Sequence, residues 1–140
     1  MAAKVPLDLI DACLTALTTT FAATSKLHWF TNSPDITKAS VLGDFTEVVS
    51  TGLVGGKTIA TWSDPYRDGI TGLETVAGAD AVGIATGAVP PAGEVIKGWY
   101  LTDSMGMELE AAAYLAVNVP IAAVGDGIVT TPTVDQSAFC

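Results

Sequence analysis

Residues 94–134 have the sequence EVIKGWYLTDSMGMELEAAAYLAVNVPIAAVGDGIVTTPTV. Their apolar and β-branched residues, typical of strands, are interrupted at Asp103–Gly106 and at Gly125–Gly127 by residues that favour turns. This order predicts a strand, a tight turn, a second strand, a loop and a third strand. We therefore expect a β-meander at the core of an all-β domain. The turn should set Trp99–Leu101 against Leu109–Tyr114.

The rest of the chain also alternates short apolar runs with turn-forming residues. This spacing predicts about seven or eight short strands, and hence an antiparallel β-sandwich or jelly roll. Between Phe45 and Trp62 a hairpin and one bulged strand fit the sequence equally well. The segment Thr37–Phe45 is expected to be a loop with one helical turn. The candidate strands before residue 94 are Ser25–Thr31, Phe45–Leu53, Lys57–Trp62, Ile70–Val76 and Ala81–Thr86.

One convincing helical period precedes these strands, at residues 6–21, where apolar residues recur at spacings of three and four. We expect an N-terminal helical arm over residues 1–24, a β-sandwich domain over residues 25–136 and a C-terminal tail over residues 137–140. The apolar stripe must be covered, either because it packs on the chain's own sheet or because the arm docks on another subunit. The stripe consists of Leu7, Ile10, Leu14, Leu17 and Phe21.

The composition narrows the classes of partner. A chain of 140 residues is long enough for one domain with its own core. Only 15% of the residues are charged, so much of the surface must be uncharged and suits contacts with neighbouring molecules. The net charge of −9 opposes binding to a phosphate backbone, and no segment approaches the roughly 20 apolar residues of a membrane span. We therefore expect neither nucleic acid nor a membrane as a partner.

The two cysteines, Cys13 and Cys140, lie near opposite ends of the chain. Two cysteines do not make the dense disulfide framework of a small secreted domain, so both are predicted to be free thiols in a reducing compartment. Asp8 and Asp11 interrupt the apolar residues near the N-terminus. A secretory signal is therefore not expected.

Three motifs that suggest chemistry lack the residues that the chemistry needs. Residues 52–58, GLVGGKT, end like a phosphate-binding loop, but Thr51 stands where that loop needs a glycine, and the following residues predict a strand. A glycine hinge is expected instead.

His28 is the only histidine, which removes most nucleophilic triads and any zinc site built on two imidazoles. A half-buried structural role is predicted for it. Ser104 lacks the Gly-x-Ser-x-Gly elbow of a hydrolase nucleophile.

The carboxylates do not form a recognisable site either. Asp64, Asp68 and Asp126 lack the spacing of a calcium-binding loop. Glu108 and Glu110 are two residues apart and are expected on the solvated face of one strand. The sequence therefore predicts no catalytic, cofactor-binding or metal-binding residue, and a protein that is not an enzyme.

The aromatic residues leave one binding function open, a sugar-stacking platform on a β-sandwich. Trp99 and Tyr100 are adjacent in a predicted strand and should point to opposite faces, so that one lies in the core if the other is exposed. An exposed aromatic side chain would serve a sugar or a subunit interface equally well. The candidates are Trp29, Trp62, Trp99, Tyr66, Tyr100 and Tyr114.

Three short segments resemble structural proteins encoded among the virion genes of tailed bacteriophages. They are residues 30–34 (FTNSP), residues 40–47 (SVLGDFTE) and residues 98–106 (GWYLTDSMG). The corresponding pieces in those proteins are similar to FTN, VLxDLTE and GYYVTDSxG. The likeness extends in order over residues 27–134. This chain departs from it in the glycine-rich segment 52–56 and in a longer helical start.

The resemblance implies a β-sandwich that adds to a capsid or tail surface, with no catalytic residues and no cofactor. It implies a capsid decoration or stabilising subunit, located in the virion after assembly in the host cytoplasm. Its partners would be the major capsid protein, other virion subunits and copies of itself. The candidate interface residues, from the helical stripe and the 63–69 loop, are Leu7, Ile10, Leu14, Leu17, Tyr66 and Arg67.

Two alternatives to this role remain. A carbohydrate-binding module, or an adhesin associated with a tail or fibre, would use the 63–69 loop and an exposed aromatic side chain. A small hydrolase that uses a pair of carboxylates ranks last.

Overall fold

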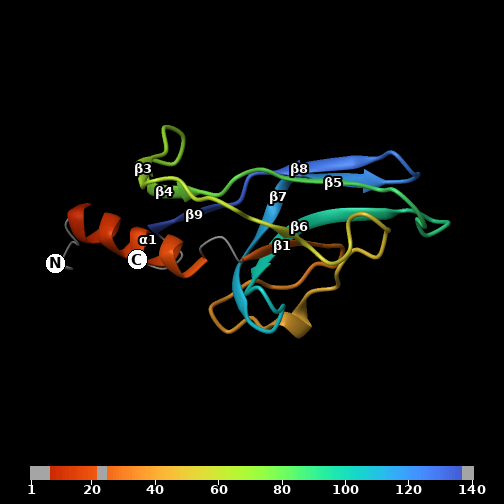
Figure 1. The fold of residues 1–140 in the computed structure, drawn as a ribbon, viewed down its shortest axis with the longest axis horizontal. Helices are drawn as coiled ribbons and strands as arrows, with labels where there is room; N and C mark the ends of the chain where they lie inside the picture. The colour runs from red at the N-terminus through yellow and green to blue at the C-terminus, as the bar shows by residue number, and fades with distance from the viewer. Residues whose placement is uncertain (1–6, 22–24, 137–140) are drawn as a thin grey trace.

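The computed structural model describes residues 7–21 and 25–136 (Figure 1). Within this part of the chain one α-helix precedes nine strands in three antiparallel sheets, which confirms a mostly β fold with an N-terminal helix. The strand count exceeds the expected seven or eight because two-residue pairings form inside segments that were expected to be loops or longer strands. The elements are α1 (Leu7–Phe21), β1 (Lys26–Phe30), the 3₁₀ helix η2 (Leu42–Asp44), β2 (Lys57–Thr58), β3 (Tyr66–Arg67), β4 (Glu74–Ala77), β5 (Ala81–Ile84), β6 (Glu94–Thr102), β7 (Leu109–Ile121), β8 (Gly127–Thr130) and β9 (Thr133–Asp135).

The largest sheet has the strand order β2-β1-β6-β7. In its β6–β7 hairpin Trp99 pairs with Ala113 and Leu101 pairs with Ala111, so the predicted register is confirmed. The connecting turn is set locally, because Gly106 has a φ of 71° and the Asp103 carboxylate accepts a hydrogen bond from the Met107 N–H. The expected strand at Ser25–Thr31 is present as β1.

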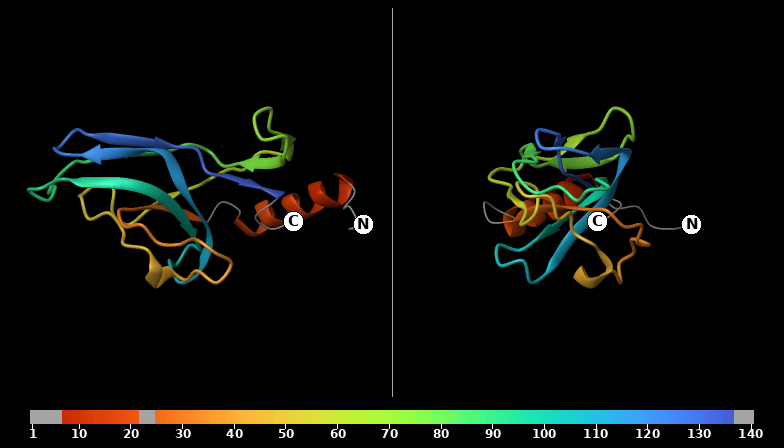
Figure 2. Two further views of the ribbon diagram at one scale, coloured as in Figure 1. Left: turned by 180° about the vertical axis from the view of Figure 1, so that it is seen from behind. Right: turned by 90° about the vertical axis from the view of Figure 1, so that its right-hand side faces the viewer.

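The predicted meander is wrong beyond this hairpin. β8 pairs with β5, with Val129 opposite Val82, and β9 pairs with β4, with Val134 opposite Val76. Figures 1 and 2 show the chain leaving β7 and returning along β5 and β4. Buried and exposed residues alternate in both β5 and β8. Their pairing places buried residues opposite buried ones, so all the buried side chains lie on the same face of this sheet.

Both faces of the large sheet are covered. Trp29 and Trp99 belong to the main core on one face, and Tyr100 packs with Phe30 and Phe45 in a smaller cluster on the other. Trp99 and Tyr100 point to opposite faces as expected, and neither is exposed, since their exposed fractions are 5% and 7%. The reason is the chain between β1 and β2, which carries Phe45 onto the second face.

The expected strand at Phe45–Leu53 is a loop that touches β1 through one bridge, between Phe30 and Glu47. Its backbone is satisfied by a side chain, because the Glu94 carboxylate accepts hydrogen bonds from the N–H groups of Val49 and Ser50 and from the Ser50 hydroxyl. The strand expected at Lys57–Trp62 is correspondingly reduced to β2. Neither a hairpin nor a bulged strand forms here.

The helix α1 lies at one end of the molecule, beside β4 and β9 (Figures 1 and 2). Ile10 and Leu14 pack with Val76 of β4 and Val134 of β9 in a separate core cluster. The apolar stripe of the helix is thus covered, at these two positions, by the chain's own sheet.

Cys13 is disulfide-bonded, which corrects the prediction of a free thiol. Cys140, the tail at residues 137–140 and residues 1–6 and 22–24 of the predicted arm lie outside the described residues.

Candidate contact surfaces

The sheet of β5 and β8 presents valine and isoleucine side chains to the solvent. Ala81 and Ile128 point into the main core, while Val82, Ile84 and Val129 on the other face are 52%, 49% and 63% exposed. Val82 and Val129 are direct cross-strand partners. We call these three residues the apolar face. An exposed apolar patch of neighbouring side chains is typical of a surface that another molecule covers.

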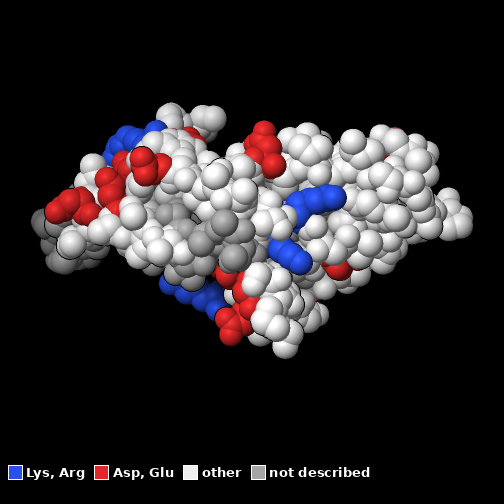
Figure 3. All heavy atoms as spheres, viewed as in Figure 1, with Lys and Arg blue, Asp and Glu red and all other residues white. Residues whose placement is uncertain are grey.

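Few charged side chains lie around the apolar face, although Asp80, two residues before Val82, is exposed and accepts a hydrogen bond from the Thr131 hydroxyl. The sequence has no charged residue from Ala81 to Gly93, and from Ala111 to Val134 it has only Asp126. The Asp126 carboxylate is engaged within its own turn, where it accepts hydrogen bonds from the N–H groups of Ala122 and Ala123. Figure 3 shows the consequence: on this side of the molecule the charges gather toward the end with α1 and β3, and the opposite end is nearly uncharged.

The predicted interface residues lie away from the apolar face. Ile10 and Leu14 are buried inside the protein, whereas Leu7 is 51% exposed at the start of α1. Tyr66 and Arg67 form β3, which lies at the same end of the molecule as α1 (Figure 1). Arg67 is held loosely, with its Nε 3.8 Å from the Glu74 carboxylate. Leu17 lies in α1, but its side chain is outside the description.

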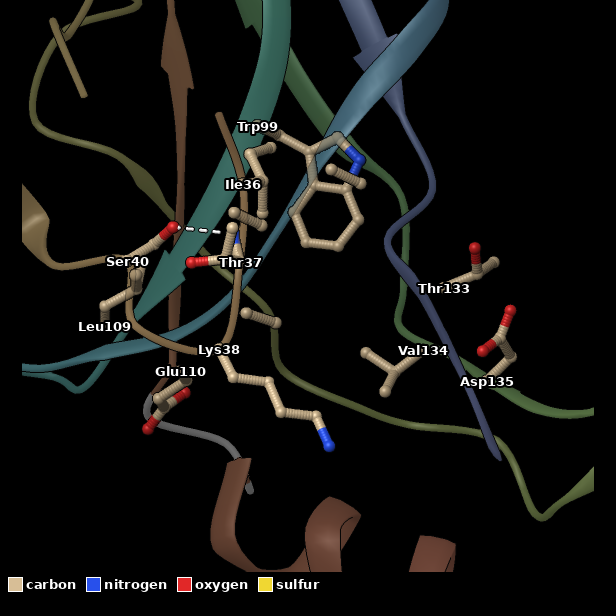
Figure 4. Close-up of a pocket in the computed structure, with 13 residues that line it drawn as sticks. Ile36, Thr37, Lys38, Ser40, Trp99, Leu109, Glu110, Thr133, Val134 and Asp135 are labelled. Carbon is tan, nitrogen blue, oxygen red and sulfur yellow. Dashed lines mark hydrogen bonds between the residues drawn. The ribbon is translucent and has the colours of Figure 1, made fainter. Parts of the chain in front are cut away.

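A groove lies between the outer edges of two sheets. In the described part of the chain, β7 is the last strand of the four-stranded sheet and β9 is the last strand of the three-stranded sheet. A cavity of about 810 Å³ separates them and is lined by Leu109–Ala113 of β7, Thr133–Asp135 of β9, Trp99 of β6 and residues of the 36–40 loop. We call this cavity the edge groove. Figure 4 shows the side chain of Lys38 extending into it.

Glu110 lies where a β-bulge interrupts the β6–β7 ladder, because Leu101 pairs with Ala111 and Thr102 pairs with Leu109. Its carboxylate accepts a hydrogen bond of 2.6 Å from the Ser25 hydroxyl. Burial raises the pKa of Glu110 and the nearby charges of Asp103 and Glu108 raise it further, although the Ser25 hydrogen bond opposes the shift. Glu110 is therefore half-buried at the rim of the edge groove, and the expectation of a solvated position is wrong for it.

His28 has protein partners on both ring nitrogens. Its Nδ1 lies 2.5 Å from Oε1 of Glu47 and its Nε2 lies 3.0 Å from the Thr102 hydroxyl oxygen. The ring stacks on Tyr100 with 5.0 Å between the centroids, and burial, aided by the charge of Glu47, raises the pKa of Tyr100 to about 12. The predicted structural role fits this geometry, in which His28 is buried rather than half-buried.

The glycine-rich segment packs beside His28 rather than opening a phosphate-binding helix. Gly56 has a φ of 78° and leaves no room for a Cβ atom next to the His28 ring. The Gly55 N–H donates to the Glu47 carboxylate, and the chain then enters the strand β2. This arrangement agrees with a glycine turn ahead of a strand.

In the acidic loops, the carboxylates accept hydrogen bonds from backbone N–H groups of the same loop. Asp68 accepts hydrogen bonds from the N–H groups of Ile70 and Thr71, and the Thr71 and Ile70 bonds lower the pKa of Asp68. Asp126 lies in the turn before β8, so the structure does not bring it together with Asp64 and Asp68 in one loop. Within residues 7–21 and 25–136, no group of three or more histidine, cysteine, aspartate or glutamate residues is arranged to hold a metal ion.

The tryptophans do not form a surface platform. Trp29 and Trp99 are buried and Trp62 is half-buried, which leaves Tyr66 and Tyr114 as the exposed aromatic side chains among the residues with described burial. Tyr114 is oriented by the protein itself, because its hydroxyl donates to the Pro34 carbonyl and its ring meets Phe30 edge-on.

The apolar face and the edge groove were both missed by the sequence interpretation. Strict alternation in β5 and β8 indicates two different faces but does not show which face a neighbour covers. The run without charge at residues 81–93 and the sparse charge at residues 111–134 are the signals that could have pointed to this end. The groove arises from strands far apart in the chain, so no local pattern marks it.

No helix in the described part of the chain is long and apolar enough to cross a membrane. No family model matches the sequence, and neither a curated protein nor a solved structure matches the chain.

Proposed function

We propose that this protein is a non-enzymatic virion structural protein of a tailed bacteriophage, a capsid decoration or stabilising subunit. It acts through contacts with the major capsid protein, other virion subunits and copies of itself. The apolar face on β5 and β8 carries this proposal, because Val82, Ile84 and Val129 form an uncharged surface that is suited to burial against protein. The short segments that resemble virion proteins are the reason why we propose a phage virion as the assembly.

We further propose that the four-stranded sheet and the β5–β8 sheet pack face to face as part of a sandwich or jelly roll. Ala81 and Ile128 on the β5–β8 sheet share one core cluster with Ile96 and Trp99 on β6, which supports face-to-face packing of the sheets.

The energetics of this role follow from composition and exposure. Burying a fully exposed valine-sized side chain contributes about 1.5–3 kcal/mol, so the partly exposed residues of the apolar face add a favourable term that the entropy cost of association opposes at each contact. The net charge of −9 keeps free copies apart in solution before assembly. Binding to neighbours then stabilises the folded subunit by mass action.

The test is addition to undecorated phage capsids, observed by negative-stain microscopy, together with the solution mass from light scattering. The variant Val82→Lys/Val129→Glu places opposite charges on a cross-strand pair, which preserves a favourable pairing and the net charge while removing the apolar face. It should fail to add. The control Ile70→Lys/Met105→Glu changes two residues that are 97% and 81% exposed elsewhere and should add normally.

A strict monomer that ignores capsids but is retarded on a polysaccharide gel would overturn the structural role. That result would favour the carbohydrate-binding alternative.

A further inference from the structure

Two strand edges border the same cavity. β7 pairs only with β6 and β9 pairs only with β4 among the described strands, so the outer edge of each strand has no strand partner there. The lining residues Leu109–Ala113 of β7 cover about 17 Å at the usual rise of a strand. Edge strands of this kind present backbone N–H and C=O groups that an additional strand can pair with.

The distal part of β7 is less suited to such pairing. Pro120, which lacks an N–H, lies there opposite Val95. The exposed edge that a partner can use is therefore the proximal part, which is the part that lines the edge groove.

The size and chemistry of the groove suit a peptide chain. Its volume of about 810 Å³ is in the upper part of the range for binding pockets. On β7 the groove is lined by Ala111, Ala112 and Ala113, whose small side chains alternate between the two faces of the sheet along this edge. Among the described lining residues, the rim carries the carboxylate of Glu110 and the ammonium group of Lys38.

The charge near Glu110 favours a cationic ligand. Asp103 and Glu108 both raise the pKa of Glu110, so negative charge is concentrated at this end of the edge groove. The bulge that holds Glu110 directs its side chain away from the regular ladder, as bulges do at binding sites on sheet edges. A lysine or arginine side chain placed here would offset the repulsion between the carboxylates.

We propose that the edge groove binds an extended peptide segment of a neighbouring subunit that carries a lysine or arginine residue. The segment adds as a strand beside β7 and β9, with main-chain hydrogen bonds to the exposed edges and its cationic side chain near Glu110. The inference rests on the proposed function, because the neighbouring subunit is a virion protein.

The experiment selects ligands from a bead-displayed library of random octapeptides with the full-length protein. The groove-filling variant Thr133→Trp changes an exposed lining residue, and Thr61→Trp is its matched control at an exposed residue outside the groove. We expect peptides that alternate β-branched residues with a lysine or arginine to be enriched by the wild-type protein and by Thr61→Trp, and not by Thr133→Trp. Equal enrichment on all three proteins, or none on the wild type, would overturn the proposal.

Two measurements on the selected peptides test the binding mode. Methylation of alternate backbone nitrogens should abolish binding if the peptide adds as a strand, since the methylated amides cannot donate. Glu110→Lys should weaken binding by about tenfold or more, while Asp64→Lys, with the same change of net charge at an exposed residue outside the groove, should leave it unchanged. Unaltered binding of the methylated peptides, or unaltered affinity in Glu110→Lys, would contradict this mode.

The failure of this inference is distinguishable from the failure of the proposed function. Capsid addition by Thr133→Trp at the wild-type level, with no peptide selected, would overturn the groove and retain the structural role. If peptides are selected but the protein does not add to capsids, the groove remains a peptide-binding site. The claim that the bound segment comes from a virion protein would then be overturned.

Discussion

Gly98 lies in a tightly packed part of β6. A Cβ atom there would overlap the Phe30 ring and the Ala113 carbonyl oxygen, whereas at Gly43 nothing lies within 4 Å of such an atom. Gly98→Ala should lower the free energy of unfolding by about 1–3 kcal/mol because neither neighbour can move freely. Urea denaturation measures this loss. Gly43→Ala is the control, and equal midpoints for the two variants would contradict the close packing.

The raised pKa of Tyr100 predicts that the free energy of unfolding falls at alkaline pH. Its pKa is raised to about 12 from an ordinary value of 10.0, so the folded state keeps the phenol proton that the unfolded state releases. The stability that this provides is complete below pH 10 and is lost as the pH rises toward 12, with a change of up to about 2 kcal/mol. Urea denaturation at pH 9 and pH 11 should show a smaller decline for Tyr100→Phe. An identical decline would show that Tyr100 is not protected.

Glu110 provides the corresponding test at acidic pH. Its pKa is raised above 4.5, so its contribution to stability is present below that pH and is lost as the carboxyl ionises at higher pH. Glu110→Gln removes the charge but keeps an acceptor for the Ser25 hydroxyl. The variant should therefore gain stability relative to wild type on going from pH 4 to pH 7, measured by urea denaturation. If the difference in free energy of unfolding between the two proteins is the same at both pH values, the pKa of Glu110 is not raised by folding.

At the scale of elements, Ile10 and Leu14 are described side chains of α1 that pack in a core cluster with β4 and β9. Leu14 is fully buried against β4 and β9, while Leu9 on the same helix is 58% exposed. Leu14→Ala should lower the free energy of unfolding by about 2–5 kcal/mol, the usual cost of such a truncation in a core. Leu9→Ala should change it by less than about 0.5 kcal/mol. If thermal or urea unfolding does not separate the two variants, the helix does not cover its own sheet.

The elements also show how far the sequence can predict this fold. The β6–β7 register was predictable because Asp103 and Gly106 fix a local turn and the flanking residues follow it directly. The partners of β8 and β9 were not, because Val129 and Val134 pair with Val82 and Val76, far away in the chain, and several strands share the same alternation. Long-range pairing therefore replaced the expected meander.

At the scale of the whole molecule, the side shown in Figure 3 carries charged side chains over the α1 end and the middle and almost none at the opposite end. The low charge fraction predicted a surface suited to contacts, but composition could not place that surface on β5 and β8. The sequence interpretation chose the helical stripe instead, because apolar spacing in a helix is the stronger signal. Ile10 and Leu14 from that stripe proved to be core residues, and only the packing around them could show this.

The measurement that tests the structural role most directly is addition to undecorated phage capsids, counted by negative-stain microscopy. The wild-type protein and Ile70→Lys/Met105→Glu should both coat the particles, and Val82→Lys/Val129→Glu should leave them bare although it remains folded. Particles that stay bare with the wild-type protein, or that are coated equally by the variant without the apolar face, would contradict the account.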